Sequence, residues 1–134
     1  METVERLGAA AGADFGPDAL RVRGRAVDAQ DVSAVLTHFA EDATLTVQSA
    51  RVTFSGHDEI GRMFVDFFGD WDSMVHEITN IVVDPTGSKV STEQHVDLNR
   101  NGTTTMHNCN FFDVGPDGKF TRVIIWMDGT NPLN

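Results

Sequence analysis

The spacing of apolar residues changes once along this chain, near residue 70. Before that point apolar residues recur three and four positions apart, which is the spacing of one helix face. After it they alternate with polar residues, as expected for β-strands with one face against a core. The sequence therefore predicts helices in its first half and a run of strands in its second.

Local signals predict where three helices begin. Pro17 suits the first turn of a helix. Asp31 is an expected N-cap for a second helix, whose apolar stripe extends to Phe39. Ser55 and Asp58 form an expected capping box before a third helix with a strong apolar stripe. These helices lie within a single domain expected at residues 17–134, after a flexible N-terminal lead-in at residues 1–16.

Strands are expected at residues 44–47, 52–54, 74–84, 89–98, 103–114 and 120–128. The last four are joined by short segments rich in Gly, Pro, Asn and Asp, which are turn formers. Strands joined this tightly pair as antiparallel hairpins. The expected fold class is α+β, with the helices on one face of a curved sheet.

Charge and cysteine content limit the kinds of molecule that this protein is expected to bind and the compartment in which it is expected. The net charge of −10 argues against nucleic acid and against an anionic membrane surface, because both are bound through Lys and Arg. There is no apolar stretch of membrane-spanning length and no signal-peptide pattern, and Cys109 is the only cysteine. We therefore expect a cytoplasmic protein that binds a small hydrophobic ligand.

Candidate acid and base groups lie on the later strands. His95 and Asp97 share one strand phase with several polar residues, so this stripe is either a solvated face or a pocket wall. Asp128 follows Trp126 at the end of the last strand, where it either closes a turn or acts in a pocket. An apolar pocket would raise the pKa of Asp128 and make it an acid or base near neutral pH.

Other residues are candidates for a ligand-binding surface. His76 lies in a mainly apolar strand phase, where it is either a core histidine or a pocket residue. Asn108 and Asn110 share a strand face with Met106 and Phe112. The expected ligand-binding residues are His76, Asn108, Asn110, Trp126, Phe39, Phe64, Phe112 and Met106. The histidines form no HxH or HExxH pattern, so we expect no metal, and no motif for another cofactor is present.

Several strings resemble the SnoaL-like branch of the NTF2-like superfamily. They are residues 28–31 (DAQD), 36–43 (LTHFAEDA), 55–60 (SGHDEI), 111–114 (FFDV) and 117–119 (DGK). The resemblance implies an NTF2-like (cystatin-like) cone, with three N-terminal helices packed into a strongly curved antiparallel sheet. It also implies a homodimer through the outer face of the sheet.

The resemblance offers several reactions, because this fold hosts unrelated chemistries. Similarity to SnoaL-like polyketide cyclases implies Asp128 as a base, with Asn108 and Asn110 holding an enolate. Similarity to limonene-type epoxide hydrolases implies Asp97 and Asp128 as the carboxylates, with His95 where that family has arginine. Similarity to dehydratases implies His76 and His95 as paired histidines.

We expect a cofactor-independent acid/base enzyme that cyclises or isomerises a small polyketide- or terpenoid-like molecule. Its expected catalytic residues are Asp128, His95 and Asp97. Epoxide hydrolysis and dehydration are the alternative reactions, and a non-catalytic ligand-binding or assembly module is the alternative class.

Overall fold

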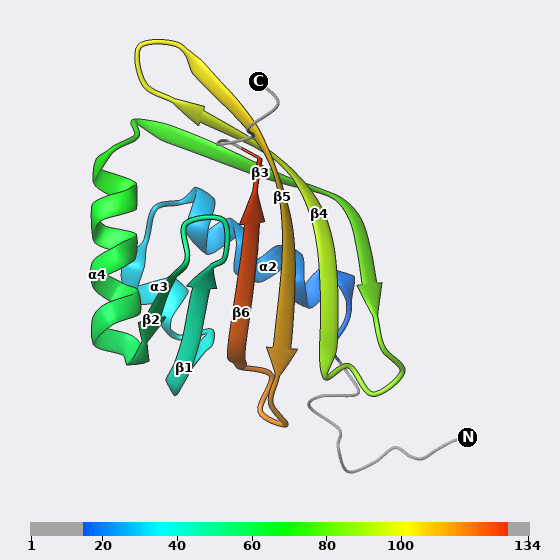
Figure 1. The fold of residues 1–134 in the computed structure, drawn as a ribbon. Coiled ribbons are helices and arrows are strands. Elements are labelled where there is room, and N and C mark those ends of the chain that lie inside the picture. The colour runs from blue at the N-terminus through cyan, green and yellow to red at the C-terminus, as the bar shows by residue number, and fades with distance from the viewer. Residues whose placement is uncertain (1–14, 129–134) are drawn as a thin grey trace.

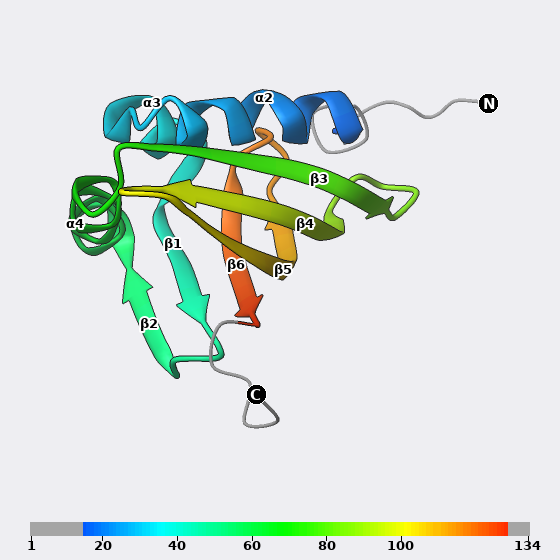
Figure 2. The same ribbon diagram turned by 90° about the horizontal axis from the view of Figure 1, so that it is seen from above.

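The computed structural model describes residues 15–128, which form a curved sheet with helices on its concave side (Figures 1 and 2). The helices of this described part are α2 (Pro17–Asp28), α3 (Val32–Leu36) and α4 (Gly56–Gly69). The strands are β1 (Phe39–Val47), β2 (Val52–Ser55), β3 (Ser73–Val83), β4 (Lys89–Asn99), β5 (Thr103–Val114) and β6 (Phe120–Met127). The predicted lead-in falls almost entirely outside the described residues, as does the segment after Asp128.

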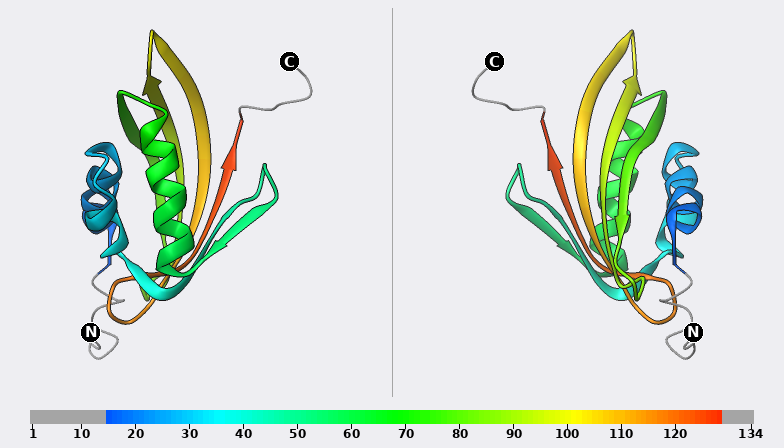
Figure 3. Two further views of the ribbon diagram at one scale, coloured as in Figure 1. Left: turned by 90° about the vertical axis from the view of Figure 1, so that its left-hand side faces the viewer. Right: turned by 90° about the vertical axis from the view of Figure 1, so that its right-hand side faces the viewer.

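The sheet has the strand order β2-β1-β6-β5-β4-β3. Strands β3 to β6 form an antiparallel meander, which confirms the predicted hairpins. The expectation of a wholly antiparallel sheet is wrong, because β1 pairs with β6 in parallel. This pairing places the last strand, β6, beside β1 near the start of the chain. Figure 3 shows the bend between the meander and the β1–β2 hairpin.

Helix α3 is shorter than the sequence predicts. Asp31 caps it as expected, since its Oδ1 accepts a hydrogen bond of 3.1 Å from the backbone N–H of Ala34. The helix nevertheless ends at Leu36, and Phe39 begins strand β1 in register with Phe120 of β6. The predicted helical position of Phe39 is therefore wrong, because pairing with β6 overrides the local apolar spacing.

Helix α4 begins where the sequence predicts, with Ser55 as its N-cap. The predicted partner in the capping box is wrong by one residue. The backbone N–H of Ser55 donates to Glu59 Oε1 at 2.8 Å, whereas no side-chain capping bond of Ser55 forms. A carboxylate from the first turn thus stabilises the start of this helix.

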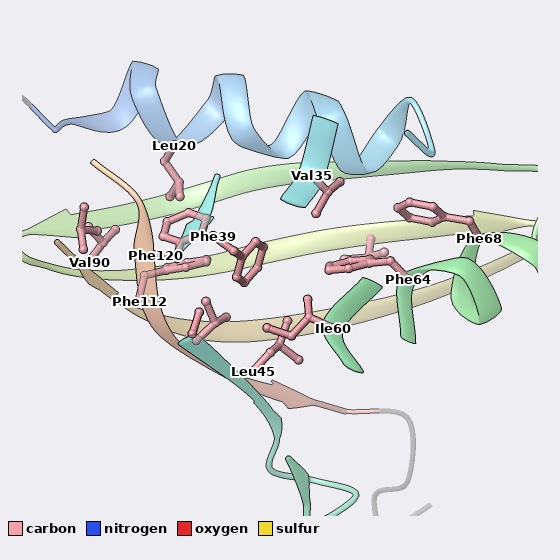
Figure 4. Packing of buried hydrophobic residues seen from close by; sticks show 14 of the residues in the cluster. Leu20, Val35, Phe39, Leu45, Ile60, Phe64, Phe68, Val90, Phe112 and Phe120 are labelled. Carbon is pink, nitrogen blue, oxygen red and sulfur yellow. The ribbon is translucent and has the colours of Figure 1, made fainter. Parts of the chain in front are cut away.

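Phenylalanines form the centre of the core on the concave side of the sheet (Figure 4). The ring of Phe120 lies 5.4 Å from that of Phe39 and 4.9 Å from that of Phe112. Phe15, predicted as part of the lead-in, is buried and packs edge-on against Phe120 at 6.2 Å. The packed domain thus includes residues before Pro17. No helix of the described residues is long and apolar enough to cross a membrane.

Candidate functional site

A cavity of about 920 Å³ lies between the concave face of the sheet and the three helices. Its walls are mostly apolar, with contributions from every helix and strand described above. The apolar lining includes Leu20, Val35, Phe39, Leu45, Met63, Phe64, Phe67, Trp71, Ile78, Val96, Met106, Phe112, Val123 and Ile125. A space of this size and character suits a small hydrophobic molecule with a few polar groups.

Strand alternation decides which residues face this cavity. On β4 the buried positions are the even-numbered ones, from Val90 to Leu98. On the central part of β5 they are Asn108, Asn110 and Phe112. Because neighbouring residues of a strand point to opposite faces, the odd-numbered positions of both strands lie on the outer face of the sheet.

A histidine–aspartate pair lies in the cavity wall, where α2 meets β3. Asp28, the last residue of α2, accepts a hydrogen bond from His76 Nδ1, with 2.7 Å between Nδ1 and Oδ1. Both carboxylate oxygens also lie 3.0 Å from the backbone N of His76. The side chains are 14% exposed for His76 and 27% for Asp28, and both residues line the cavity.

This contact fixes how His76 can act. A carboxylate that already accepts the backbone N–H of His76 also accepts the ring N–H, so the proton sits on Nδ1. Nε2, on the other edge of the ring, is then the basic nitrogen. The pair is thus built to take a proton at Nε2 while Asp28 balances the imidazolium charge.

A second histidine, His38, lines the cavity near its Arg23 side. Burial lowers the pKa of His38, and the positive charge of Arg23 lowers it further. The Arg23 guanidinium donates to the backbone carbonyls of Ala19 and Gly118, each at 2.8 Å, and its centre lies 4.7 Å from the ring centroid of Phe15. These contacts make Arg23 part of the packing that joins α2 to the β5–β6 turn.

The structure brings seven of the predicted ligand-binding residues together in the cavity lining, namely His76, Asn108, Asn110, Phe39, Phe64, Phe112 and Met106. Trp126 is the exception. It lies on the outer face of β6 with 48% of its surface exposed, so its expected place in the pocket is wrong. Ligand binding by the other seven stays a prediction.

The two predicted catalytic residues on β4 point away from the cavity. His95 and Asp97 occupy odd-numbered positions, with side chains 36% and 37% exposed. His95 Nε2 lies 3.1 Å from Asp97 Oδ1. A hydrogen bond of 2.7 Å from Thr105 Oγ1 lowers the pKa of Asp97, and the nearby imidazoles lower it further. Of the two alternatives for this polar stripe, the solvated face holds and the pocket wall is wrong.

Asp128 is also on the outer face, beside His107. Its carboxylate accepts the backbone N–H of His107 at 3.0 Å, and its other oxygen lies 3.4 Å from His107 Nδ1. The backbone hydrogen bond is the main reason why the pKa of Asp128 is lowered. The expectation of a buried Asp128 with a raised pKa is wrong, since this side chain is 50% exposed.

These positions remove all three predicted mechanisms, and enolate formation by Asp128 fails because Asp128 does not line the cavity. Epoxide opening by Asp97, His95 and Asp128 requires all three inside the cavity, and none lines it. Dehydration by a His76–His95 pair fails because the two residues lie on opposite faces of the sheet. Between residues 15 and 128, no group of three or more His, Cys, Asp or Glu side chains is arranged to hold a metal ion.

Sequence reasoning missed several polar residues of the lining, among them His38, Asp28 and Gln94. Asp28 and Gln94 both had a signal. Asp28 continues the helical spacing of Leu20 and Gly24, so it is a carboxylate on the apolar stripe of α2. Gln94 falls in the same strand phase as Val96, so it is an amide among core positions. A polar residue in an apolar phase marks a pocket better than a polar stripe does.

Comparison with known proteins places this fold in a family. The model of the SnoaL-like domain matches residues 22–123. Among curated proteins, none matches the chain.

Solved structures share the fold at low sequence identity. A putative polyketide cyclase from Sinorhizobium meliloti is 24% identical, with a TM-score of 0.64 over 82% of this chain and 94% of that one. A putative SnoaL-like polyketide cyclase from Shewanella putrefaciens CN-32 is 11% identical, with a TM-score of 0.72 over 84% and 91%. An LEH-like epoxide hydrolase from M. tuberculosis is 18% identical, with a TM-score of 0.70 over 88% and 83%. With a family model matched along most of its length and this shared fold, the chain belongs to the SnoaL-like family of the NTF2-like superfamily.

Proposed function

We propose that this protein is a cofactor-independent acid/base enzyme that cyclises or isomerises a small hydrophobic ketone of polyketide or terpenoid type. The observation that carries the proposal is the His76–Asp28 pair in the wall of a largely apolar cavity. The similarity to putative polyketide cyclases supports the substrate type.

The proposed reaction begins with proton transfer from carbon. His76 Nε2 takes a proton from the carbon beside a carbonyl group, and the electrons of the broken C–H bond form an enolate. Asp28 stabilises the resulting imidazolium through the 2.7 Å contact with Nδ1. In an isomerisation, the proton returns to a different carbon. In a cyclisation, the enolate carbon attacks a second carbonyl of the same molecule, whose oxygen takes the proton from His76.

The apolar walls contribute by excluding water from the enolate. Because an apolar environment disfavours an isolated charge, the imidazolium depends on Asp28 and on the enolate itself for its stabilisation. No carboxylate other than Asp28 is required for this scheme. It therefore replaces the Asp128-centred mechanism that the sequence predicts.

Hydrogen–deuterium exchange tests the proposal without knowledge of the natural substrate. The probe is 2-tetralone, a two-ring ketone, in D₂O, with loss of its α-proton signals followed by ¹H NMR. The wild-type protein should accelerate exchange in a saturable way, and His76→Gln should return it to the buffer rate. His107→Gln is the matched control, since it removes the histidine of an outer-face His–Asp pair.

Two results would contradict the proposal. One is wild-type exchange no faster than in buffer, and the other is acceleration that survives His76→Gln. Binding of 2-tetralone without exchange favours the alternative class, a ligand-binding module that uses the same cavity.

A further inference from the structure

Two asparagines on the floor of the cavity have buried polar atoms without partners. Asn108 and Asn110 follow each other on the concave face of β5, and each is only 7% exposed. The Oδ1 atom of each is fully buried and has no hydrogen-bond partner within the described residues 15–128. Buried amide oxygens are almost always paired, because an unpaired one destabilises the fold. Two unpaired amide oxygens side by side in a cavity lining indicate that a bound molecule supplies their hydrogen-bond partners.

On the neighbouring strand β4, two buried polar side chains are hydrogen-bonded to each other. Gln94 lies opposite Asn108, and Thr92 lies opposite Asn110. Gln94 Nε2 donates to Thr92 Oγ1 at 3.0 Å, so these two β4 side chains are hydrogen-bonded to each other. The asparagines lie in the same two rows of the sheet but do not share in that bond. Polar side chains are therefore present in both rows, yet neither asparagine Oδ1 is hydrogen-bonded to them.

The chemistry of the missing partner follows from the side chains. A carboxamide is neutral, and half a turn about its last bond exchanges its acceptor and donor ends with little change in shape. It can therefore bind a hydroxyl or a keto group, but it cannot balance the charge of a carboxylate or phosphate. Arg23, a positive charge in the lining, is already bound to two backbone carbonyls.

The strand geometry gives the spacing of the partner groups. Residues two apart on a strand are about 7 Å apart, which is the separation of the two asparagines along β5. His76 lies two strands away, in line with Met106 through Val96. Strand spacing then puts its Cα about 12 Å from that of Asn108 and about 17 Å from that of Asn110 on a flat sheet. The curvature of this sheet shortens both distances for groups inside the cavity.

We propose that Asn108 and Asn110 are specificity-determining residues that bind two uncharged oxygen substituents, hydroxyl or keto, near one end of an elongated substrate. The placement of the reacting carbon at His76, at the other end, rests on the proposed function. The substrate is thus a neutral, elongated molecule, with oxygens about 7 Å apart on the part remote from the reacting carbon.

Ligand affinity tests this proposal independently of catalysis. The probes are naphthalene-2,6-diol, with hydroxyls at opposite ends of a two-ring skeleton, and naphthalene, which has none. Equilibrium dialysis with detection by ultraviolet absorbance gives Kd for each. Asn108→Leu and Asn110→Leu should each raise Kd for the diol about 2- to 12-fold, the usual effect of one lost hydrogen bond. Neither change should weaken the binding of naphthalene.

Asn80→Leu is the matched control, because Asn80 is exposed on β3 and donates to Glu93 on the outer face. It should leave both Kd values unchanged. If leucine does not fit, Asn108→Ala and Asn110→Ala remove the same amide groups without added volume. An unchanged Kd for the diol in both floor variants would overturn the proposal, and so would an absence of diol binding to the wild type.

Thermal stability gives a second readout that a purely structural role would not produce. Without ligand, Asn110→Leu should raise Tm by about 3–6 °C, because it removes an unpaired buried oxygen. A structural asparagine would instead lower Tm when replaced. A lower Tm together with an unchanged diol Kd contradicts the proposal.

The two proposals fail separately. Loss of the diol preference in the floor variants, with no tetralone exchange in the wild type, supports the asparagine site and rejects the His76 chemistry. Exchange that depends on His76, with diol affinity indifferent to Asn108 and Asn110, does the reverse.

Discussion

Replacing Asp28 by Asn should reverse the proton positions on the His76 ring while leaving the fold nearly intact. In the wild type, Asp28 accepts both the backbone N–H and the ring Nδ1–H of His76. An asparagine that keeps accepting the backbone N–H must aim its amide N–H₂ at the ring. Nδ1 then becomes the acceptor and the ring proton moves to Nε2. The nitrogen proposed as the base is thereby blocked.

The expected magnitudes separate this effect from unfolding. The variant exchanges charge-assisted hydrogen bonds for neutral ones at a site where Asp28 is 27% exposed. The free energy of unfolding should fall by about 1 kcal/mol. Proton transfer should slow by about 10²- to 10⁴-fold, as expected when a general base is held in the wrong tautomer.

Three measurements check this prediction. Long-range ¹H–¹⁵N NMR spectra report which ring nitrogen of His76 carries the proton, urea denaturation gives the free energy of unfolding, and α-proton exchange of 2-tetralone gives the rate. Asp97→Asn and Asp128→Asn are matched controls, since each alters an outer-face His–Asp pair. They should change the exchange rate less than about twofold. An unchanged tautomer or an unchanged rate in Asp28→Asn would refute the reasoning.

Further predictions concern pH, the core and the outer face. Burial and Arg23 lower the pKa of His38 in the folded protein below its ordinary 6.5. As the pH falls, His38 is therefore protonated in the unfolded chain before it is protonated in the folded one. Stability is then complete above pH 6.5 and declines as the pH falls toward the folded-state pKa, so His38→Gln should flatten the plot of Tm against pH there. Ile60→Ala, at a position with 0% exposure, should cost about 2–5 kcal/mol in urea denaturation, while Val65→Ala on the exposed side of the same helix should change stability by under about 0.5 kcal/mol. If the outer sheet face forms the predicted homodimer, Trp126→Lys should yield monomers in light scattering, and a monomeric wild type would contradict that prediction.

The sequence predicts the strand meander well because its signals are local. Alternation and turn residues predict β5 at residues 103–114, and the structure has it at Thr103–Val114. The parallel pairing of β1 with β6 has no local signal, since it joins Leu45 to Val123 across most of the chain. The same pairing draws Phe39 out of its predicted helix. Errors in the fold thus arise where a contact distant in sequence outweighs a local preference.

To predict the site, one must know which alternate residues of a strand face the cavity. Polarity alone selects the residues that face outward. On β4 the conspicuous polar residues, His95 and Asp97, face outward because the opposite phase holds Val96 and Leu98 in the core. Thr92 and Gln94 belong to that apolar phase and are the polar side chains buried beside the cavity. A shift of one residue exchanges the two faces, so an error of phase moves every candidate on the strand.

The three His–Asp pairs found between residues 15 and 128 show why a short motif would not reveal the cavity pair. His95 and Asp97 are two residues apart on one strand, so they lie on the same face of the sheet. They would be in contact whether that face pointed into the cavity or into solvent. A concave apolar face accepts a charged group only when a partner compensates it. Here that partner comes from another element, since 48 residues separate Asp28 on α2 from His76 on β3. The pair that can do chemistry is therefore formed by the packing of α2 against the sheet, and any change that loosens that contact should disable His76 before it unfolds the domain.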